Sequence, residues 1–204
     1  MKMKMRKREP MTKPQLVLDI GGVLATNLSP FFWNQLGEAG QISTERLYAA
    51  YKQQWSSLLW KGEISEKEFW DWLLIELPGV SYDKARAMLD NSLTPLPALE
   101  MIADWSGYAD IHILSNHRAE WVRPLLSPIM PYLATVTISS EVGSSKPEMV
   151  SFTAVHRKLP VGSSVLFVDD QPKNLLTAEQ LGWDTLLADE AGEWIPQVEL
   201  LLLG

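Results

Sequence analysis

The sequence predicts an α/β fold, a three-layer Rossmann-like core with a parallel sheet plus an inserted α-helical cap. Five short apolar runs alternate with helical patterns, which is typical of βαβ units. Several of these runs end directly in carboxylate or hydroxyl residues. One long interval, residues 27–105, contains helical patterns and no convincing strand. The chain therefore reads as a sheet-based core interrupted once by helices.

The five apolar runs are the predicted strands. We expect them at residues 16–20, 111–114, 135–138, 165–168 and 185–187. Asp19 lies at the end of the first strand, Ser115 follows the second, and the pair Asp169 and Asp170 follows the fourth. Because ligands of parallel α/β sheets bind beyond the carboxyl ends of the strands, we expect these residues to meet at one edge.

The inserted helices have their own sequence signals. We expect a flexible basic tail at 1–14, a core at 15–26 and 96–204, and the helical insertion at 27–95. A first helix is predicted at 43–60, a second opens at the Ser65–Glu68 capping box and stops at Pro78, and a third spans 82–93. The apolar face expected on the first helix is Leu47, Tyr48, Tyr51, Trp55, Leu58 and Leu59. Most of the five Trp residues of the insertion should form its core, and one or two of its aromatic side chains could line a substrate pocket.

Composition excludes several classes of protein. At 204 residues the chain should form one core domain and a smaller inserted one. A net charge of −7 disfavours a nucleic-acid binder, and the absence of cysteine excludes disulfides and thiolate metal sites. No apolar run is long enough to span a membrane, and the first eight residues, five of them basic, do not resemble a secretory signal. We expect a cytoplasmic protein with no membrane partner.

The residues at the strand ends suggest phosphate chemistry. A fixed carboxylate such as Asp19 can attack a phosphoryl group, and Gly21 and Gly22, which tolerate φ > 0, would let the backbone curl around the phosphate. The adjacent carboxylates Asp169 and Asp170 would repel each other without a cation, and Mg²⁺ is the natural one.

Two further segments would complete a phosphate site. Ser115 and Asn116 would donate hydrogen bonds to phosphate oxygens. Lys146 would neutralise charge, with Pro147 fixing a helix start so that the ammonium is aimed back at the site.

The order of these motifs resembles the haloacid dehalogenase (HAD) superfamily, from residue 16 to about residue 187. Its commonest members are Mg-dependent phosphatases that work through an aspartyl-phosphate. The resemblance implies that Asp19 is the nucleophile, and that Asp19, Asp169 and Asp170 bind Mg²⁺ with the Gly21 carbonyl as a further ligand. It also implies that the inserted helices form a cap over Asp19.

One position departs from the usual pattern. Phosphatases of the family usually read Asp-x-Asp, with the second Asp protonating the leaving group, whereas this chain has Gly21 there. The Gly-Gly-Val-Leu continuation resembles a subgroup that carries Gly at this position. His117 could act as a substitute acid. Without an acid, acyl, aryl or anomeric sugar phosphates would still be accessible, because their leaving groups need little protonation.

We therefore expect a Mg-dependent phosphomonoesterase that acts on a small phosphorylated metabolite as a monomer or homodimer. One alternative is a haloacid-dehalogenase-type hydrolase, which uses the same nucleophile. It needs no Mg²⁺, however, and carries Tyr at the position of Gly21. The other alternative is a non-catalytic protein that binds phosphate or a partner.

Overall fold

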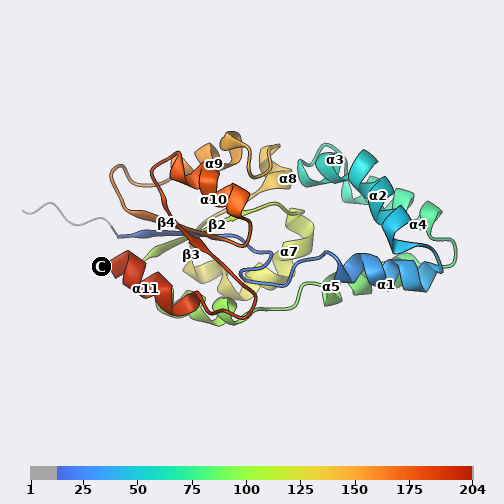
Figure 1. The fold of residues 1–204 in the computed structure, drawn as a ribbon, viewed down its shortest axis with the longest axis horizontal. Coiled ribbons are helices and arrows are strands. Elements are labelled where there is room, and N and C mark those ends of the chain that lie inside the picture. Colours follow the sequence, from blue (N-terminus) through green and yellow to red (C-terminus); the bar gives the residue numbers. More distant parts are fainter. Residues whose placement is uncertain (1–12, 204) are drawn as a thin grey trace, which may run out of the picture.

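The core of the molecule is a five-stranded parallel sheet. In a computed structural model (Figure 1), which describes residues 13–203, the strand order is β3-β2-β1-β4-β5. The strands are β1 Gln15–Leu18, β2 Asp110–Ser115, β3 Leu133–Ile138, β4 Val165–Asp169 and β5 Asp184–Leu187. All five predicted strands are confirmed, although β1 ends at Leu18, one residue before Asp19. Most of the predicted basic tail lies outside the described residues.

Helices cover both faces of the sheet and make the three predicted layers. Leu16 and Leu18 pack with Trp105, Val122 and other side chains of the layer that contains α6, α7 and α11. Neighbouring strand positions point to the opposite layer, which contains α9 and α10. The elements of the core are η1 Pro97–Met101, α6 Ile102–Trp105, α7 Ala119–Leu126, η2 Ser127–Tyr132, α8 Ser139–Val142, α9 Met149–His156, α10 Pro172–Glu179 and α11 Ile195–Leu203.

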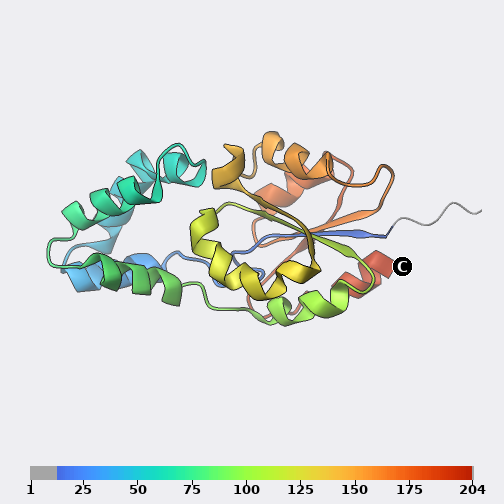
Figure 2. The ribbon, with the colours of Figure 1, turned by 180° about the vertical axis from the view of Figure 1, so that it is seen from behind.

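A second group of helices lies beyond one end of the sheet (Figures 1 and 2). These are α1 Phe31–Gly40, α2 Thr44–Gln54, α3 Ser56–Trp60, α4 Glu66–Glu76 and α5 Tyr82–Asn91. We call α1–α5 the helical module. Its apolar side chains form a separate core, rich in aromatic rings, which one residue of the sheet domain, Trp121 of α7, also joins.

The module differs from the sequence expectation in three details. The helix predicted at 43–60 is two helices, because the chain turns at Trp55 (φ −119°, ψ −32°) between α2 and α3. As a result Leu58 is exposed instead of lying on the buried face. The helix predicted to reach residue 93 ends at Asn91. The Ser65–Glu68 capping box is confirmed, and α4 ends before Pro78.

The module is connected to the core by two segments that run side by side. The backbone N–H of Thr26 donates to the Thr94 carbonyl at 2.9 Å, and Thr94 N donates to the Thr26 hydroxyl at 3.0 Å. The N–H of Leu96 donates to the Leu24 carbonyl at 3.0 Å. These bonds fix where the module leaves the sheet. Within residues 13–203, no helix combines the length and apolar character needed to cross a membrane.

Candidate active site

The turn after β1 fixes Asp19 at the carboxyl edge of the sheet. Its backbone N–H donates to the Val168 carbonyl at 3.0 Å, and its Oδ1 accepts from the backbone N–H of Ile20 at 2.7 Å. The side chain is largely buried, yet it lines a cavity at this edge of the sheet. A carboxylate held by backbone contacts on both sides has a defined direction, which an in-line nucleophile requires.

Gly21 and Gly22 have different roles in this turn. Gly22 adopts a left-handed conformation (φ 70°), whereas Gly21 does not, so the expectation of φ > 0 holds for Gly22 alone. A Cβ on Gly22 would lie 2.6 Å from the carboxyl group of Asp170. Gly22 therefore lets the first and fourth strand ends approach each other. A Cβ on Gly21 would meet only the Asn27 side chain, at 2.7 Å from Oδ1.

The two adjacent aspartates face different surroundings. Asp169 is fully buried and accepts hydrogen bonds from Lys146 Nζ (2.5 Å) and the Gln171 backbone N–H (2.8 Å). Asn174 Nδ2 also donates to both carboxylate oxygens of Asp169, at 2.9 and 3.0 Å. Asp170 is half-buried and lines the cavity, where its Oδ2 accepts from Asn27 Nδ2 and Gln171 Nε2, each at 2.9 Å.

Lys146 connects the strand ends electrostatically. Its Nζ lies 2.8 Å from Asp19 Oδ2 and 2.5 Å from Asp169 Oδ2. Burial lowers the pKa of Lys146, but the two carboxylates outweigh burial, so its pKa is raised and the ammonium stays charged. Burial also raises the pKa of Asp169, against the opposing effect of Lys146. Pro147 does not open the helix as expected, since α9 begins at Met149.

Asn116 positions the lysine. Its Nδ2 donates to the Lys146 carbonyl at 2.8 Å, and its Oδ1 accepts from the Lys146 backbone N–H at 2.7 Å. These two hydrogen bonds to Asn116, and not a helix beginning at Pro147, hold the backbone of Lys146 in place. The side-chain amide of Asn116 is thus already engaged by the Lys146 backbone. Ser115, at the end of β2, is buried and lines the cavity.

His117 is placed beside the site, in an apolar environment. Its ring packs against Trp60 (centroids 5.4 Å apart) and Trp121 (6.2 Å), and its Nδ1 is buried with no hydrogen-bond partner in the described part of the chain. Burial lowers the pKa of His117 to about 3. The ring is therefore uncharged at neutral pH, which weighs against the substitute-acid role suggested by its sequence position.

These residues surround a cavity of about 360 Å³. It brings together seven of the residues selected from sequence: Asp19, Gly21, Ser115, Asn116, His117, Lys146 and Asp170. Sequence reasoning missed Asn27, Asn174 and the specific contribution of Trp60. Asn174 has a local signal, because it lies one turn into the helix that follows Asp169. Asn27 and Trp60 have none, since they reach the cavity only through tertiary packing.

The acidic residues of this site fit a divalent cation. Asp19, Asp169 and Asp170 each offer a carboxylate oxygen, and these atoms lie within 4.8 Å of one another. The three carboxylates share one ammonium group, that of Lys146, so the cluster carries an excess of negative charge. Proteins usually hold Mg²⁺ by one or two carboxylates, with phosphate oxygens and water completing the shell, and this cluster offers at least that many.

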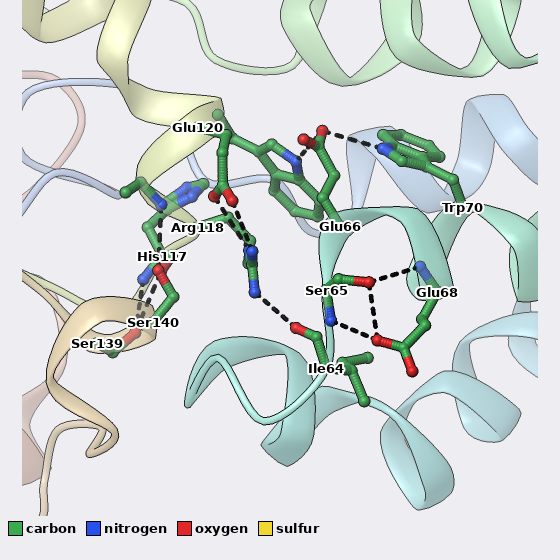
Figure 3. A network of polar contacts seen from close by, with 12 residues as sticks. Ile64, Ser65, Glu66, Glu68, Trp70, His117, Arg118, Glu120, Ser139 and Ser140 are labelled. Atoms are coloured by element: carbon green, nitrogen blue, oxygen red, sulfur yellow. Dashed lines mark hydrogen bonds and ion pairs between the residues drawn. The ribbon is translucent and has the colours of Figure 1, made fainter.

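Polar contacts dock the module onto the core next to the cavity (Figure 3). Arg118, which is buried, donates from Nη1 to the Ile64 carbonyl at 2.8 Å and pairs with Glu120 at 2.7 Å. On the same side Lys61 Nζ lies 2.6 Å from Glu148 Oε1. These contacts hold the end of α3, and with it Trp60, against the site.

No protein-family model matches the sequence, and no curated protein matches it significantly. Among solved structures, the chain is similar to the HAD family enzyme bt-2542 from Bacteroides thetaiotaomicron in complex with magnesium and inorganic phosphate. The TM-score is 0.77 at 22% identity, over 91% of this chain and 99% of that one. A predicted HAD-like family hydrolase from Porphyromonas gingivalis gives 0.74 at 24% identity, over 94% and 98%. A HAD phosphatase from Thermococcus onnurineus gives 0.60 at 17% identity, over 88% of each chain. The chain therefore has the fold of the HAD-family hydrolases.

Proposed function

We propose that the protein is a Mg²⁺-dependent phosphomonoesterase that uses Asp19 as its nucleophile and acts on a small phosphorylated metabolite. The observation that carries the proposal is the cluster of Asp19, Asp169, Asp170 and Lys146 at one sheet edge, lining or bordering a single cavity. The similar Bacteroides enzyme, whose complex contains magnesium and inorganic phosphate, supports the same ligands here.

In the proposed reaction, a carboxylate oxygen of Asp19 attacks phosphorus and the bond from phosphorus to the leaving oxygen breaks, with the electron pair leaving on that oxygen. Water then attacks phosphorus and loses a proton to solvent, the bond from phosphorus to Asp19 breaks, and the free carboxylate and inorganic phosphate are released. Lys146, whose Nζ lies 2.8 Å from Asp19 Oδ2, would place positive charge beside the reacting carboxylate. Ser115 and the backbone N–H of Asn116 would hold phosphate oxygens.

Asp19 and Asp170, with Asp169 behind them and the Gly21 carbonyl, would hold the Mg²⁺ ion. When bound, this ion would neutralise the negative charge of the phosphoryl group. The fully buried Asp169 would mainly orient Lys146, since its oxygens already accept hydrogen bonds from protein donors. The helical module would act as the cap, because it brings Trp60 to the same cavity.

An aryl phosphate assay with Mg²⁺ and with chelator tests this function. We expect turnover that requires the metal. Turnover of a haloacid without metal would favour the dehalogenase alternative, and phosphate binding without turnover would favour the non-catalytic one.

A further inference from the structure

The module side of the cavity is chemically unlike the phosphate side. Resting on the proposed phosphatase function, we infer that Trp60, Tyr51 and His117 form a leaving-group subsite for an uncharged ring. This ring would be joined to phosphate through an oxygen that departs without a proton. Aryl phosphates and anomeric sugar phosphates both have this chemistry.

Trp60 lies where the cavity at the sheet edge meets an aromatic recess. Leu28, Ser29 and Trp60 line both the 360 Å³ cavity and an adjacent cavity of about 60 Å³ inside the module. The aromatic residues that line this recess with Trp60 are Phe32, Trp33, Tyr48, Tyr51, Phe69 and Trp121. A flat ring is the group that such a wall accommodates best, through stacking and edge contacts.

Two polar atoms, one from a residue that lines the recess (Tyr51) and one from a residue that lines the larger cavity (His117), are buried without a partner among the described residues. The Tyr51 hydroxyl and His117 Nδ1 have no hydrogen bond within residues 13–203, and their residues are 3% and 5% exposed. Burial raises the pKa of Tyr51, so its hydroxyl keeps its proton. A buried polar atom without a hydrogen-bond partner is destabilising. A ligand with a hydroxyl or carbonyl group would satisfy these atoms.

The charge of the wall disfavours a second, buried anionic group on the substrate. The cationic residues that line the two cavities are Lys52, Lys146 and Lys173. Lys146 is engaged by Asp19 and Asp169, while Lys52 and Lys173 are exposed. An anion against Trp60 would therefore be desolvated without a buried cation beside it, which is unfavourable.

Among the described residues that line the two cavities, no carboxyl group other than those of Asp19 and Asp170 could protonate the leaving oxygen. Gly21 has no carboxyl group, and the His117 ring is buried between two indoles. The carboxylates that remain are those assigned to the nucleophile and metal. The leaving oxygen must then depart as an anion and take its proton from solvent afterwards. Aryl and anomeric oxygens tolerate this far better than alkoxides, for which an acid would contribute about 10²–10⁴-fold.

Two phosphates of one sugar test the inference on the wild-type protein. The anomeric phosphate of glucose and the phosphate of its primary hydroxyl share the same sugar but differ in leaving oxygen, a hemiacetal oxygen in one and a primary alkoxide in the other. We expect kcat/KM to favour the anomeric ester, or phenyl phosphate over a simple alkyl phosphate, by about 100-fold or more. The faster of the two preferred esters, glucose anomeric phosphate or phenyl phosphate, shows whether the subsite takes a sugar ring or an aryl ring. Equal rates across both pairs would overturn the inference while leaving the phosphatase function intact. Absence of turnover of every ester, and of acetyl phosphate, would instead overturn the function itself.

Variants of Trp60 test the subsite. Trp60→Leu should lower kcat/KM for the preferred ring ester at least about tenfold more than for acetyl phosphate, whose leaving group is too small to reach the recess. Trp60→Phe should keep most of the preference, and Trp72→Leu is the matched control, since Trp72 lies in the module but lines neither cavity. Equal losses on ring esters and acetyl phosphate would contradict the subsite. If Trp60→Leu does not fold, the wild-type comparison decides alone.

Discussion

Glu66 on α4 of the helical module accepts a hydrogen bond from the indole N–H of Trp121 on core helix α7, at 2.8 Å. The same oxygen, Oε1, also accepts from Trp70 Nε1 at 3.0 Å and from Arg86 Nη1 at 2.7 Å (Figure 3 shows Glu66 with Trp70). One carboxylate oxygen therefore connects the module to the sheet domain. The connection lies beside Trp60 and His117, whose rings pack on Trp121 and on each other.

We expect Glu66→Ala to destabilise the protein by about 2–4 kcal/mol, because it leaves two largely buried indole N–H groups and Arg86 without their acceptor. Glu66→Gln keeps an acceptor oxygen and should lose less. Urea unfolding measures both variants. Glu76→Ala, on the exposed end of the same helix, is the control. Equal losses in Glu66→Ala and Glu76→Ala would show that the carboxylate does not stabilise the junction.

Removing each aspartate of the pair should separate metal binding from lysine positioning. Asp170 lines the cavity, whereas the oxygens of Asp169 are occupied by Lys146, Gln171 and Asn174. Asp170→Ala should therefore weaken Mg²⁺ binding more than Asp169→Asn, which keeps one oxygen and the shape of the buried side chain. Calorimetric titration with Mg²⁺ measures the difference. The opposite order, in folded variants, would place the metal on Asp169.

Restoring a carboxylate at position 21 should change substrate preference. A Cβ at Gly21 meets only the end of the Asn27 side chain, and Gly21 is not left-handed, so Gly21→Asp should fold. The new acid should raise the ratio of kcat/KM for alkyl over aryl phosphates by about tenfold or more. Gly21→Asn is the control of equal size that cannot donate an acid proton. The same ratio in both variants would mean that proton donation does not limit alkyl ester hydrolysis.

Stability should depend on pH through His117. Its pKa is lowered by burial from 6.5 to about 3. Between these values the unfolded chain binds the proton and the folded one does not, so the free energy of unfolding falls as pH falls from about 6.5 towards 3. The slope from this group is about 1.4 kcal/mol per pH unit.

Wild type and His117→Phe should be compared by urea unfolding at pH 7 and pH 4.5. We expect the variant to lose less stability on acidification, since the other titrating groups are common to both proteins. Parallel pH profiles would show that His117 is not buried as a neutral ring.

The fold was largely readable from the sequence because buried parallel strands are continuous apolar runs, and those before Asp19 and Asp169 end in conspicuous polar residues. Local capping signals such as Ser65–Glu68 were equally reliable. The break at Trp55 was not readable, because it separates two helices within one apolar pattern and depends on packing inside the module.

Within the site, the identity of the residues was more predictable than their contacts. Lys146 was assigned to the site from its sequence context, yet the group that aims it is the Asn116 side chain, thirty residues away, and not Pro147. Asn27 and Trp60 reach the cavity from outside the strand ends. Such contacts depend on how distant segments pack, and no local pattern in the sequence encodes them.

The central claim is that Asp19 is the nucleophile, and turnover by Asp19→Asn tests it most directly. The amide keeps the shape of the side chain and its hydrogen bond with the Ile20 N–H, but it is no longer a nucleophilic carboxylate. With folding verified by circular dichroism and Mg²⁺ present, we expect kcat on an aryl phosphate to fall by about 10⁴-fold or more. A folded Asp19→Asn protein that retains wild-type kcat would contradict the covalent mechanism.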